Sequence, residues 1–405
     1  MNELNEGRRG VNVWAFYPLM VVPGIVLLLA PATVESIMGY FHFHESLGGL
    51  LQVAYFTGGF VGIISITRLM QRFDVKQITL SQVVLLSASL LAASFAPWYP
   101  LLLAFYFVCG IANGILIAFP GVYVTHVSGE SSHQAQNILY SFFALGVLSG
   151  PLLVALVINH NDAMWRWAFR VPALMILPLA VPVGVMALER LEGVKAISRD
   201  VVKEILDWSR GFFLWLLLAI VLYIAAEAAV SMWLITFLED KYGVGSRGAH
   251  LTLTALWAGL VLGRWICAYL TRKIDPFRVL TFLTFASALT LLVAPLAGSK
   301  AAAFIMYPLL GLFYSGIYPF LIAYASWFPP DLSGAVFTIF VGLGAVGGAV
   351  LPYLVGLVNQ FAGVVLGMSS ISIAVFGVLA CLYWLRGHVS ERPTIDATAL
   401  PGEGI

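Results

Sequence analysis

Twelve apolar segments constrain this chain more than any other feature, because each is long enough to cross a lipid bilayer. A helix needs about 20 apolar residues to cross a ~30 Å hydrocarbon core. Strands of a membrane barrel would alternate in hydropathy over ~10 residues, whereas the stretch LLLAFYFVCGIANGILIAF is apolar at every position or nearly so. The sequence therefore predicts an all-α membrane protein with twelve transmembrane helices. They are expected near 13–39, 47–69, 77–96, 100–125, 134–158, 165–188, 211–238, 248–271, 277–297, 301–327, 333–358 and 363–385.

The small number of charged residues excludes several classes of protein. Only 10% of the residues are charged, so they cannot cover the surface of a soluble protein of this length. A formal net charge of +1 provides no basic face for a phosphate backbone, which excludes nucleic acid as a main partner. The remaining partners are the lipid bilayer and a small-molecule solute, and we expect the protein to act as a monomer.

No pattern of catalytic or metal-binding residues lies within the apolar segments. The three cysteines have no CxxC spacing, and the seven histidines lie in connections or at segment ends. The motifs HExxH, GxSxG and GxxxxGK[ST] do not occur in the sequence. We therefore expect a protein that is not an enzyme, has no metal or other cofactor, and draws energy from a gradient or from a partner.

The distribution of lysine and arginine predicts the orientation in the membrane. With the N-terminus inside, 16 of these residues fall on the cytoplasmic side and 5 on the opposite side. Both termini are therefore expected in the cytoplasm of a multi-pass protein of the plasma (inner) membrane. The polar run 189–210 then becomes a central cytoplasmic linker.

The sequence also matches itself at an offset of 201 positions, which is about half the chain. This register predicts two six-helix halves that arose by duplication. The halves are expected at 1–188 and 211–388, with the linker at 189–210 and a cytoplasmic tail at 389–405. The matched pairs are Gly58 and Gly259, Gly62 and Gly263, Asp74 and Asp275, Gly110 and Gly311, Tyr123 and Tyr324, Glu130 and Asp331, Gly146 and Gly347, and Pro151 and Pro352.

This two-half plan resembles that of the major facilitator superfamily, whose halves are parallel repeats. The second half resembles the fucose permease type of sugar:proton symporter. The similar stretches are AEAAVSMWLITFLEDKYGV, LWAGLVLGRW, GLFYSGIYPFLIAYASWF and VGLGAVGGAVLPYLVG. The resemblance implies the major facilitator fold and a carrier that moves its solute, with a proton, by alternating access.

Two acidic residues are candidates for proton coupling. Glu227 follows Gly211 by 16 residues, which places it ~24 Å along a helix that rises 1.5 Å per residue. An ionised carboxylate at that depth is unfavourable unless it is paired, hydrated or protonated, so Glu227 is expected to link protonation to solute binding. Glu35 lies near the outer end of the first span, as a second proton site or an extracellular gate. The alternatives are a protonated packing residue for Glu227 and a solvated span end for Glu35.

Amide and aromatic side chains within the spans are candidates for solute binding. Amides both donate and accept hydrogen bonds, and a ring stacks on the C–H face of a sugar. For the amides the alternative is hydrogen bonding between helices, and for the aromatic residues it is ordinary contact with lipid. The candidates are Asn113, Gln136, Asn137, Tyr140, Trp233, Trp257, Tyr314 and Tyr318.

A set of charged residues at the cytoplasmic ends of the spans is expected to form a gate. Their ion pairs would close the inner side in one state and break in the other. These residues are Arg68, Arg72, Glu130, Arg264, Arg272 and Asp331. Because no mid-span lysine or arginine lies outside the cytoplasmic third, the solute is expected to be neutral.

Two hypotheses on function follow from the sequence. The first is proton-coupled symport of a small, neutral, sugar-like solute by alternating access. The alternative is proton-driven efflux of an amphipathic or drug-like compound, which fits the 13% aromatic content and the spacing of Gly146, Gly150 and Pro151.

Overall fold

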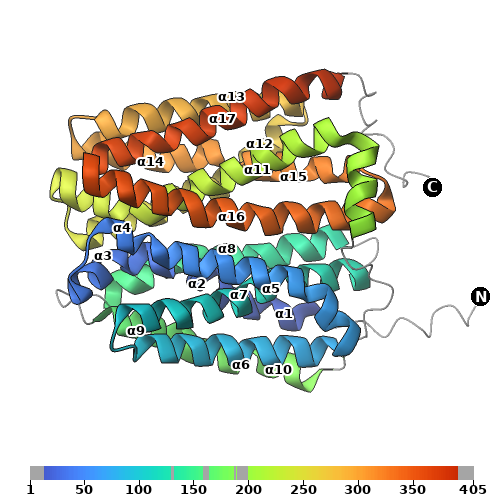
Figure 1. Ribbon diagram of the computed structural model, residues 1–405, viewed down its shortest axis with the longest axis horizontal. Coiled ribbons are helices and arrows are strands. Elements are labelled where there is room, and N and C mark those ends of the chain that lie inside the picture. Colours follow the sequence, from blue (N-terminus) through green and yellow to red (C-terminus); the bar gives the residue numbers. More distant parts are fainter. Residues whose placement is uncertain (1–12, 129–131, 158–163, 187, 189–198, 391–405) are drawn as a thin grey trace, which may run out of the picture.

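The computed structural model describes residues 13–128, 132–157, 164–186, 188 and 199–390 of the chain. Throughout these ranges the regular elements are all helices, and twelve segments are long and apolar enough to cross a membrane. The expectation of an all-α protein with twelve membrane-spanning helices is therefore confirmed. Figure 1 shows the helices lying side by side in one bundle.

The first six spans form what we call the N-terminal half of the bundle. Several spans consist of more than one helix, because the chain bends within them. In chain order the elements are η1 (Val13–Ala15), α1 (Phe16–Leu19), α2 (Val21–Leu27), α3 (Leu29–Phe41), α4 (Glu45–Gly48), α5 (Leu50–Arg72), α6 (Val75–Ser94), α7 (Tyr99–Ser128), α8 (Ser132–Val157), α9 (Trp165–Leu179) and α10 (Val181–Val185).

The C-terminal half lies above the N-terminal half in Figure 1 and runs from yellow-green to red. We call one end of the bundle the linker end; it carries Val13, Arg199 and Ser390. We call the opposite end the distal end; it carries the α3–α4 and α11–α12 connections. The elements of this half are α11 (Arg199–Tyr242), α12 (Ser246–Leu270), α13 (Pro276–Val293), η4 (Ala294–Leu296), α14 (Lys300–Tyr314), α15 (Ile317–Ala323), η5 (Tyr324–Trp327), α16 (Pro330–Ala362) and α17 (Val364–Ser390).

The two halves use glycine in the same way where their helices cross. A methyl group added at Gly58 of α5 would clash with the Phe107 carbonyl oxygen of α7. A methyl group added at Gly259 of α12 would clash with the Pro308 carbonyl oxygen of α14. Gly259 and Pro308 lie 201 positions after Gly58 and Phe107. Small residues allow helices in a membrane to approach closely. The two crossings are therefore related by the offset of 201 positions, and the bounds of the two halves stay a prediction.

Prolines account for the breaks within spans. A proline inside a helix lacks an N–H group, and its ring clashes with the carbonyl group four residues earlier. In the first span α1, α2 and α3 are separated at Met20 and Leu28, which precede Pro23 and Pro31 by three residues. In the tenth span α14 ends at Tyr314 and α15 begins at Ile317, again just before a proline, Pro319.

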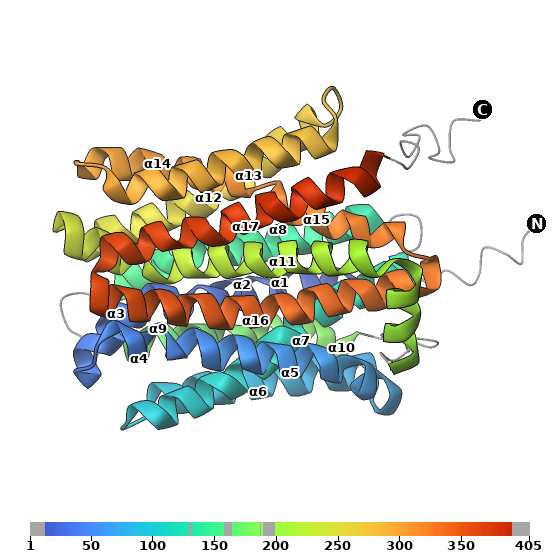
Figure 2. The same ribbon diagram turned by 45° about the horizontal axis from the view of Figure 1, so that its top comes forward.

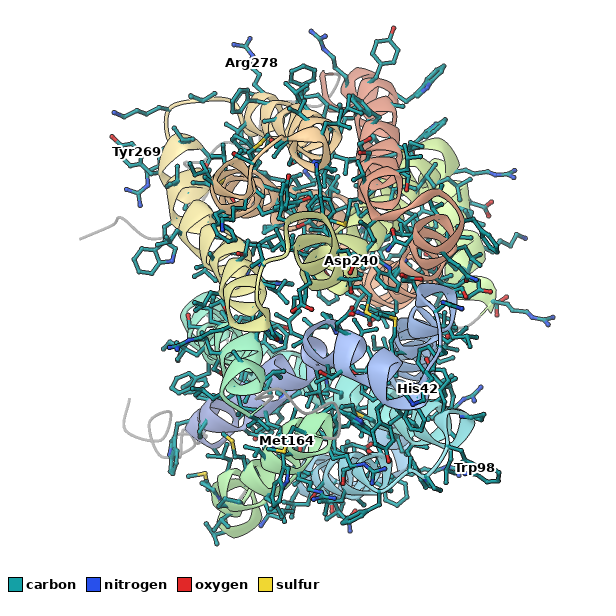
Figure 3. The ribbon with its side chains drawn as sticks, turned by 90° about the vertical axis from the view of Figure 1, so that its left-hand side faces the viewer. His42, Trp98, Met164, Asp240, Tyr269 and Arg278 are labelled. Atoms are coloured by element: carbon teal, nitrogen blue, oxygen red, sulfur yellow. The ribbon has the colours of Figure 1, made fainter. Side chains whose placement is uncertain are left out.

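The seventh span begins earlier than the sequence analysis predicts. Helix α11 starts at Arg199, not near 211, and Ser209 has non-helical backbone angles (φ −164°, ψ 80°) that bend it sharply. Residues 199–208 therefore form a short arm that crosses the linker end of the bundle (Figures 1 and 2). The arm buries Ile205 and packs Trp208 against Phe328, with ring centroids 4.6 Å apart. Part of the predicted linker is therefore helical, and 189–198 lies outside the described residues.

Candidate functional site

Glu227 lies about midway between the bend at Ser209 and the end of α11 at Tyr242, and its carboxyl group accepts a hydrogen bond. The hydroxyl group of Tyr223, one turn earlier on the same helix, lies 2.8 Å from Glu227 Oε1. The same hydroxyl lies 3.1 Å from the backbone carbonyl oxygen of Tyr314. A tyrosine hydroxyl has a single proton to donate, so Tyr223 donates to one of these two acceptors at a time.

The break in the tenth span leaves the Tyr314 carbonyl oxygen free to accept a hydrogen bond from another helix. Tyr314 is the last residue of α14, and the last four carbonyl groups of an α-helix have no partner within the helix. The carbonyl oxygen of Tyr314 can therefore accept the proton of Tyr223, which lies on a different helix.

Aromatic and charged side chains surround this carboxyl group. The Tyr223 ring packs against Tyr314 and Tyr318, with centroid distances of 5.5 Å and 6.3 Å. Arg264 of α12 interacts electrostatically with Glu227. Tyr140 of α8, in the N-terminal half, lies near Tyr318 of α15.

We call these six residues the central cluster: Tyr140, Tyr223, Glu227, Arg264, Tyr314 and Tyr318. Glu227, Tyr140 and Tyr318 are half-buried, and Arg264 is exposed. The cluster joins the two halves and combines an acid, a base and four phenol rings. Five of its members are candidates from the sequence, whereas Tyr223 was missed, although its i, i+4 spacing to Glu227 is visible in the sequence.

Three other candidates for solute binding use their polar groups to join helices. Asn113 is fully buried, and its Nδ2 donates to the Tyr55 hydroxyl over 2.6 Å and to the Pro23 carbonyl oxygen over 3.2 Å. Gln136 Nε2 donates to the Gly121 carbonyl oxygen over 3.0 Å. Trp233 Nε1 donates to the Pro352 carbonyl oxygen over 2.8 Å. The side chain of Asn137 lies outside the described residues.

Trp257 differs from these three residues because its polar group has no partner. It is 7% exposed, and its indole N–H lacks a hydrogen-bond acceptor among the described residues. The Tyr314 hydroxyl is also buried and without a partner there. An unpaired buried polar group is unfavourable, so these two groups are suited to bind a polar solute.

Glu35 belongs to a different part of the molecule. It lies on α3 toward the distal end, where its Oε2 accepts a hydrogen bond from Thr236 Oγ1 of α11 over 2.9 Å. It also interacts electrostatically with Glu239 of α11. Glu35 therefore joins the two halves at the distal end, apart from the central cluster.

The structure describes only part of the predicted gate. The side chains of Arg68, Arg72 and Arg272 are exposed toward the linker end. Glu130 and the side chain of Asp331 lie outside the described residues. The ion pairs of the gate therefore stay a prediction.

Comparison with known proteins identifies the family. The family model described as Major Facilitator Superfamily matches residues 19–352. A gentisate transporter of Corynebacterium glutamicum is 24% identical, with 96% of this chain and 88% of that protein covered. A putative glucose/galactose transporter of Helicobacter pylori is 23% identical, with 67% of this chain and 70% of that protein covered.

Solved structures share the fold at lower identity. A bacterial homologue of the human lysosomal transporter Spinster, in an inward-facing and unoccupied conformation, has a TM-score of 0.81 at 15% identity, with 96% of this chain and 100% of that chain covered. The fucose:proton symporter of E. coli has a TM-score of 0.66 at 18% identity, with 92% and 98% covered. Together these matches indicate a multi-pass membrane transporter and not an enzyme, and the chain belongs to the major facilitator superfamily.

Proposed function

We propose that the protein is a secondary active transporter that moves a small polar, sugar-like solute by alternating access and couples this movement to a proton through Glu227. The observation that carries the proposal is the half-buried carboxyl group within the seventh span, hydrogen-bonded to Tyr223 and joined through the central cluster to both halves. An acidic residue within a membrane span is a functional candidate by default.

The hydrogen bonds of Tyr223 suggest how protonation affects the helices. When Glu227 is ionised, it only accepts, and Tyr223 donates to it over 2.8 Å. When Glu227 is protonated, it can donate to the Tyr223 oxygen, and Tyr223 then donates to the Tyr314 carbonyl oxygen over 3.1 Å. A proton on Glu227 would thus strengthen the contact between α11 and the broken tenth span.

A sugar is the first candidate solute. The unpaired indole N–H of Trp257 and hydroxyl of Tyr314 can bond to sugar hydroxyl groups. The half-buried ring of Tyr318 can stack on a C–H face. The relative named as a putative glucose/galactose transporter supports this class of solute.

A small aromatic acid is the second candidate, and Arg264 is the observation that favours it. The expectation of a neutral solute rests on the lack of mid-span lysine and arginine outside the cytoplasmic third, whereas the Arg264 side chain interacts electrostatically with Glu227. An arginine can bind a carboxylate with two parallel hydrogen bonds. The relative named as a gentisate transporter supports an aromatic acid.

The proposal includes an orientation. The linker end would face the cytoplasm of the inner membrane, since it collects most lysine and arginine residues. Residues 1–188 and 211–388 would move relative to each other about the central cluster. The charged residues of the predicted gate would close the linker end when the distal end opens.

Transport by the purified protein in liposomes tests the function. Radiolabelled monosaccharides and hydroxybenzoates are offered with and without an imposed pH gradient to wild type, Glu227→Gln and Glu204→Gln. Glu204 is an exposed residue of the α11 arm, so its variant makes the same change of side chain away from the cluster. We expect gradient-driven accumulation of one solute class in wild type and Glu204→Gln, and only equilibration in Glu227→Gln. The same accumulation in all three proteins would contradict coupling through Glu227. If neither monosaccharides nor hydroxybenzoates accumulate, the proposed solutes are wrong, and efflux of an amphipathic compound becomes the explanation.

A further inference from the structure

A buried histidine joins the two halves at the distal end. His250 of α12 is 2% exposed. Its Nε2 lies 2.8 Å from the backbone carbonyl oxygen of Ala32 on α3, in the other half. Its Nδ1 lies 2.7 Å from the carbonyl oxygen of Ser246, one turn earlier on α12. Both ring nitrogens therefore face a hydrogen-bond acceptor at short distance.

This geometry fits an imidazolium better than a neutral ring. A carbonyl oxygen can only accept a hydrogen bond, and a neutral imidazole has one donor nitrogen and one acceptor nitrogen. In a neutral ring, one nitrogen lone pair would point at a carbonyl oxygen. The Ser246 hydroxyl, 3.3 Å from Nδ1, could donate to a neutral ring, but the Ser246 carbonyl oxygen is closer and would still face that lone pair.

We propose that His250 is a proton-binding site that holds the distal end closed, with both ring nitrogens protonated and Nε2–H bonded to the N-terminal half. When the distal end opens, Nε2 leaves the Ala32 carbonyl oxygen, and the ring gives one proton to water on that side and becomes neutral. The proton site lies away from the central cluster. The inference rests on the alternating access of the proposed function but not on Glu227.

Other ionisable groups lie on the helices next to the histidine at the distal end. Glu239 of α11 interacts electrostatically with Glu35 of α3. Among the other elements packed against α12, the distal part of α8, residues 146–157, has no ionisable residue. At the distal end of α11, α12 and α14 the other ionisable groups are Asp240, Lys241 and Tyr242, the exposed side chains of Arg247 and Lys300, and the buried phenol of Tyr307.

Other close contacts join the two halves at the distal end, between α4 and the helices α11 and α16. A methyl group added at Gly48 of α4 would lie 3.3 Å from the Trp233 ring of α11. One added at Gly356 of α16 would lie 2.7 Å from the Glu45 carbonyl oxygen of α4. At the offset of 201 positions His250 matches Gly49. The N-terminal half therefore has no histidine at the matching position, and the proton site occurs once, between α12 and α3.

Nitrogen NMR of the full-length protein in lipid nanodiscs tests the protonation state directly. The protein carries ¹⁵N-labelled histidine, and His250→Gln identifies the His250 signals by their loss. At pH 7 we expect both ring nitrogens to show the shifts of a protonated imidazole. Ser246→Ala removes the hydroxyl but keeps the carbonyl oxygen, so the doubly protonated signal should stay. A neutral ring at pH 7, with Nδ1 unprotonated, would overturn the proposal.

Distance measurements between spin labels test the effect on the distal end. Labels at Trp98→Cys and Phe361→Cys, both on exposed residues near this end, report the separation of the halves, and the native cysteines are buried. We expect the short, closed distance to lose population as the pH rises in wild type, and His250→Phe to favour the longer distance at every pH. An unchanged distribution in His250→Phe, or one independent of pH in wild type, would refute the role.

Both measurements are made without solute or gradient, so they succeed or fail independently of coupling through Glu227. If His250→Phe does not fold, the NMR titration of wild type still decides the protonation state. His250→Gln, whose amide can donate to the Ala32 carbonyl oxygen without a charge, should then keep the closed distance but lose its dependence on pH.

Discussion

The Tyr223 hydroxyl provides a sharp test of the central cluster. Tyr223→Phe removes the one oxygen atom that lies 2.8 Å from Glu227 Oε1 and 3.1 Å from the Tyr314 carbonyl oxygen. It keeps the ring, which packs at 5.5 Å from Tyr314. The variant therefore separates hydrogen bonding from packing at this position.

The size of the effect follows from the charge of the acceptor. A hydrogen bond to a charged group contributes about 1.5–3 kcal/mol, and each ~1.4 kcal/mol corresponds to a tenfold change. We therefore expect Tyr223→Phe to lower the initial rate of gradient-driven uptake by about 10- to 100-fold. Solute exchange without a gradient does not require a change in the protonation of Glu227, so it should fall much less.

The assay is radiolabelled uptake into proteoliposomes, measured with an imposed pH gradient and as exchange at equal pH. Tyr307→Phe is the matched control, because its buried hydroxyl lacks a partner within the described part of the chain. This control should stay within about twofold of wild type, since no hydrogen bond is lost. Unchanged uptake in Tyr223→Phe, or an equal loss in both variants, would refute the role of the Tyr223 hydroxyl.

Three further predictions concern packing and the class of solute. Gly259→Ala should destabilise the protein by about 1–3 kcal/mol, because the added methyl group meets the Pro308 carbonyl oxygen. Gly298→Ala should not, since its methyl group would have nothing within 4 Å. Thermal unfolding in detergent compares the two variants, and equal midpoints would contradict the close approach of α12 and α14 at Gly259. Asn113→Leu should also lower the unfolding midpoint, because the Tyr55 hydroxyl and the Pro23 carbonyl oxygen lose their partner, and a buried polar group left unpaired costs about 1–3 kcal/mol. An unchanged midpoint with weaker solute binding would instead indicate that Asn113 contacts the solute. If the transported class is the hydroxybenzoates, Arg264→Gln should abolish their uptake. If it is the monosaccharides, uptake should persist in Arg264→Gln, and its loss would show a structural role of Arg264.

The twelve helices could be predicted because they depend on a local feature of the sequence. Apolar length alone gives twelve spans. The offset of 201 positions pairs Gly58 with Gly259, and the structure places both at a helix crossing where a methyl group would clash. The bend at Ser209 and the arm before it were missed, because a polar run can form a helix that buries only a few residues, such as Ile205.

The candidate site was less predictable because residue type does not determine what a side chain contacts. From the sequence, Asn113 and Tyr318 are both candidates for binding a sugar. In the structure Asn113 is buried between helices, whereas Tyr318 is half-buried in the central cluster. Arg264 lies near a span end, but a long arginine side chain can reach away from its backbone position. His250 also lies at a span end, and only the packing of α12 against α3 shows that it is buried.

Proton movement driven by solute tests coupling through Glu227 most directly. Liposomes containing a pH-sensitive dye and the purified protein receive an inward gradient of the transported solute, with no pH gradient at the start. The account predicts acidification of the lumen with wild type and Glu204→Gln and none with Glu227→Gln, although Glu227→Gln still equilibrates the solute. Acidification by Glu227→Gln at the wild-type rate would contradict it.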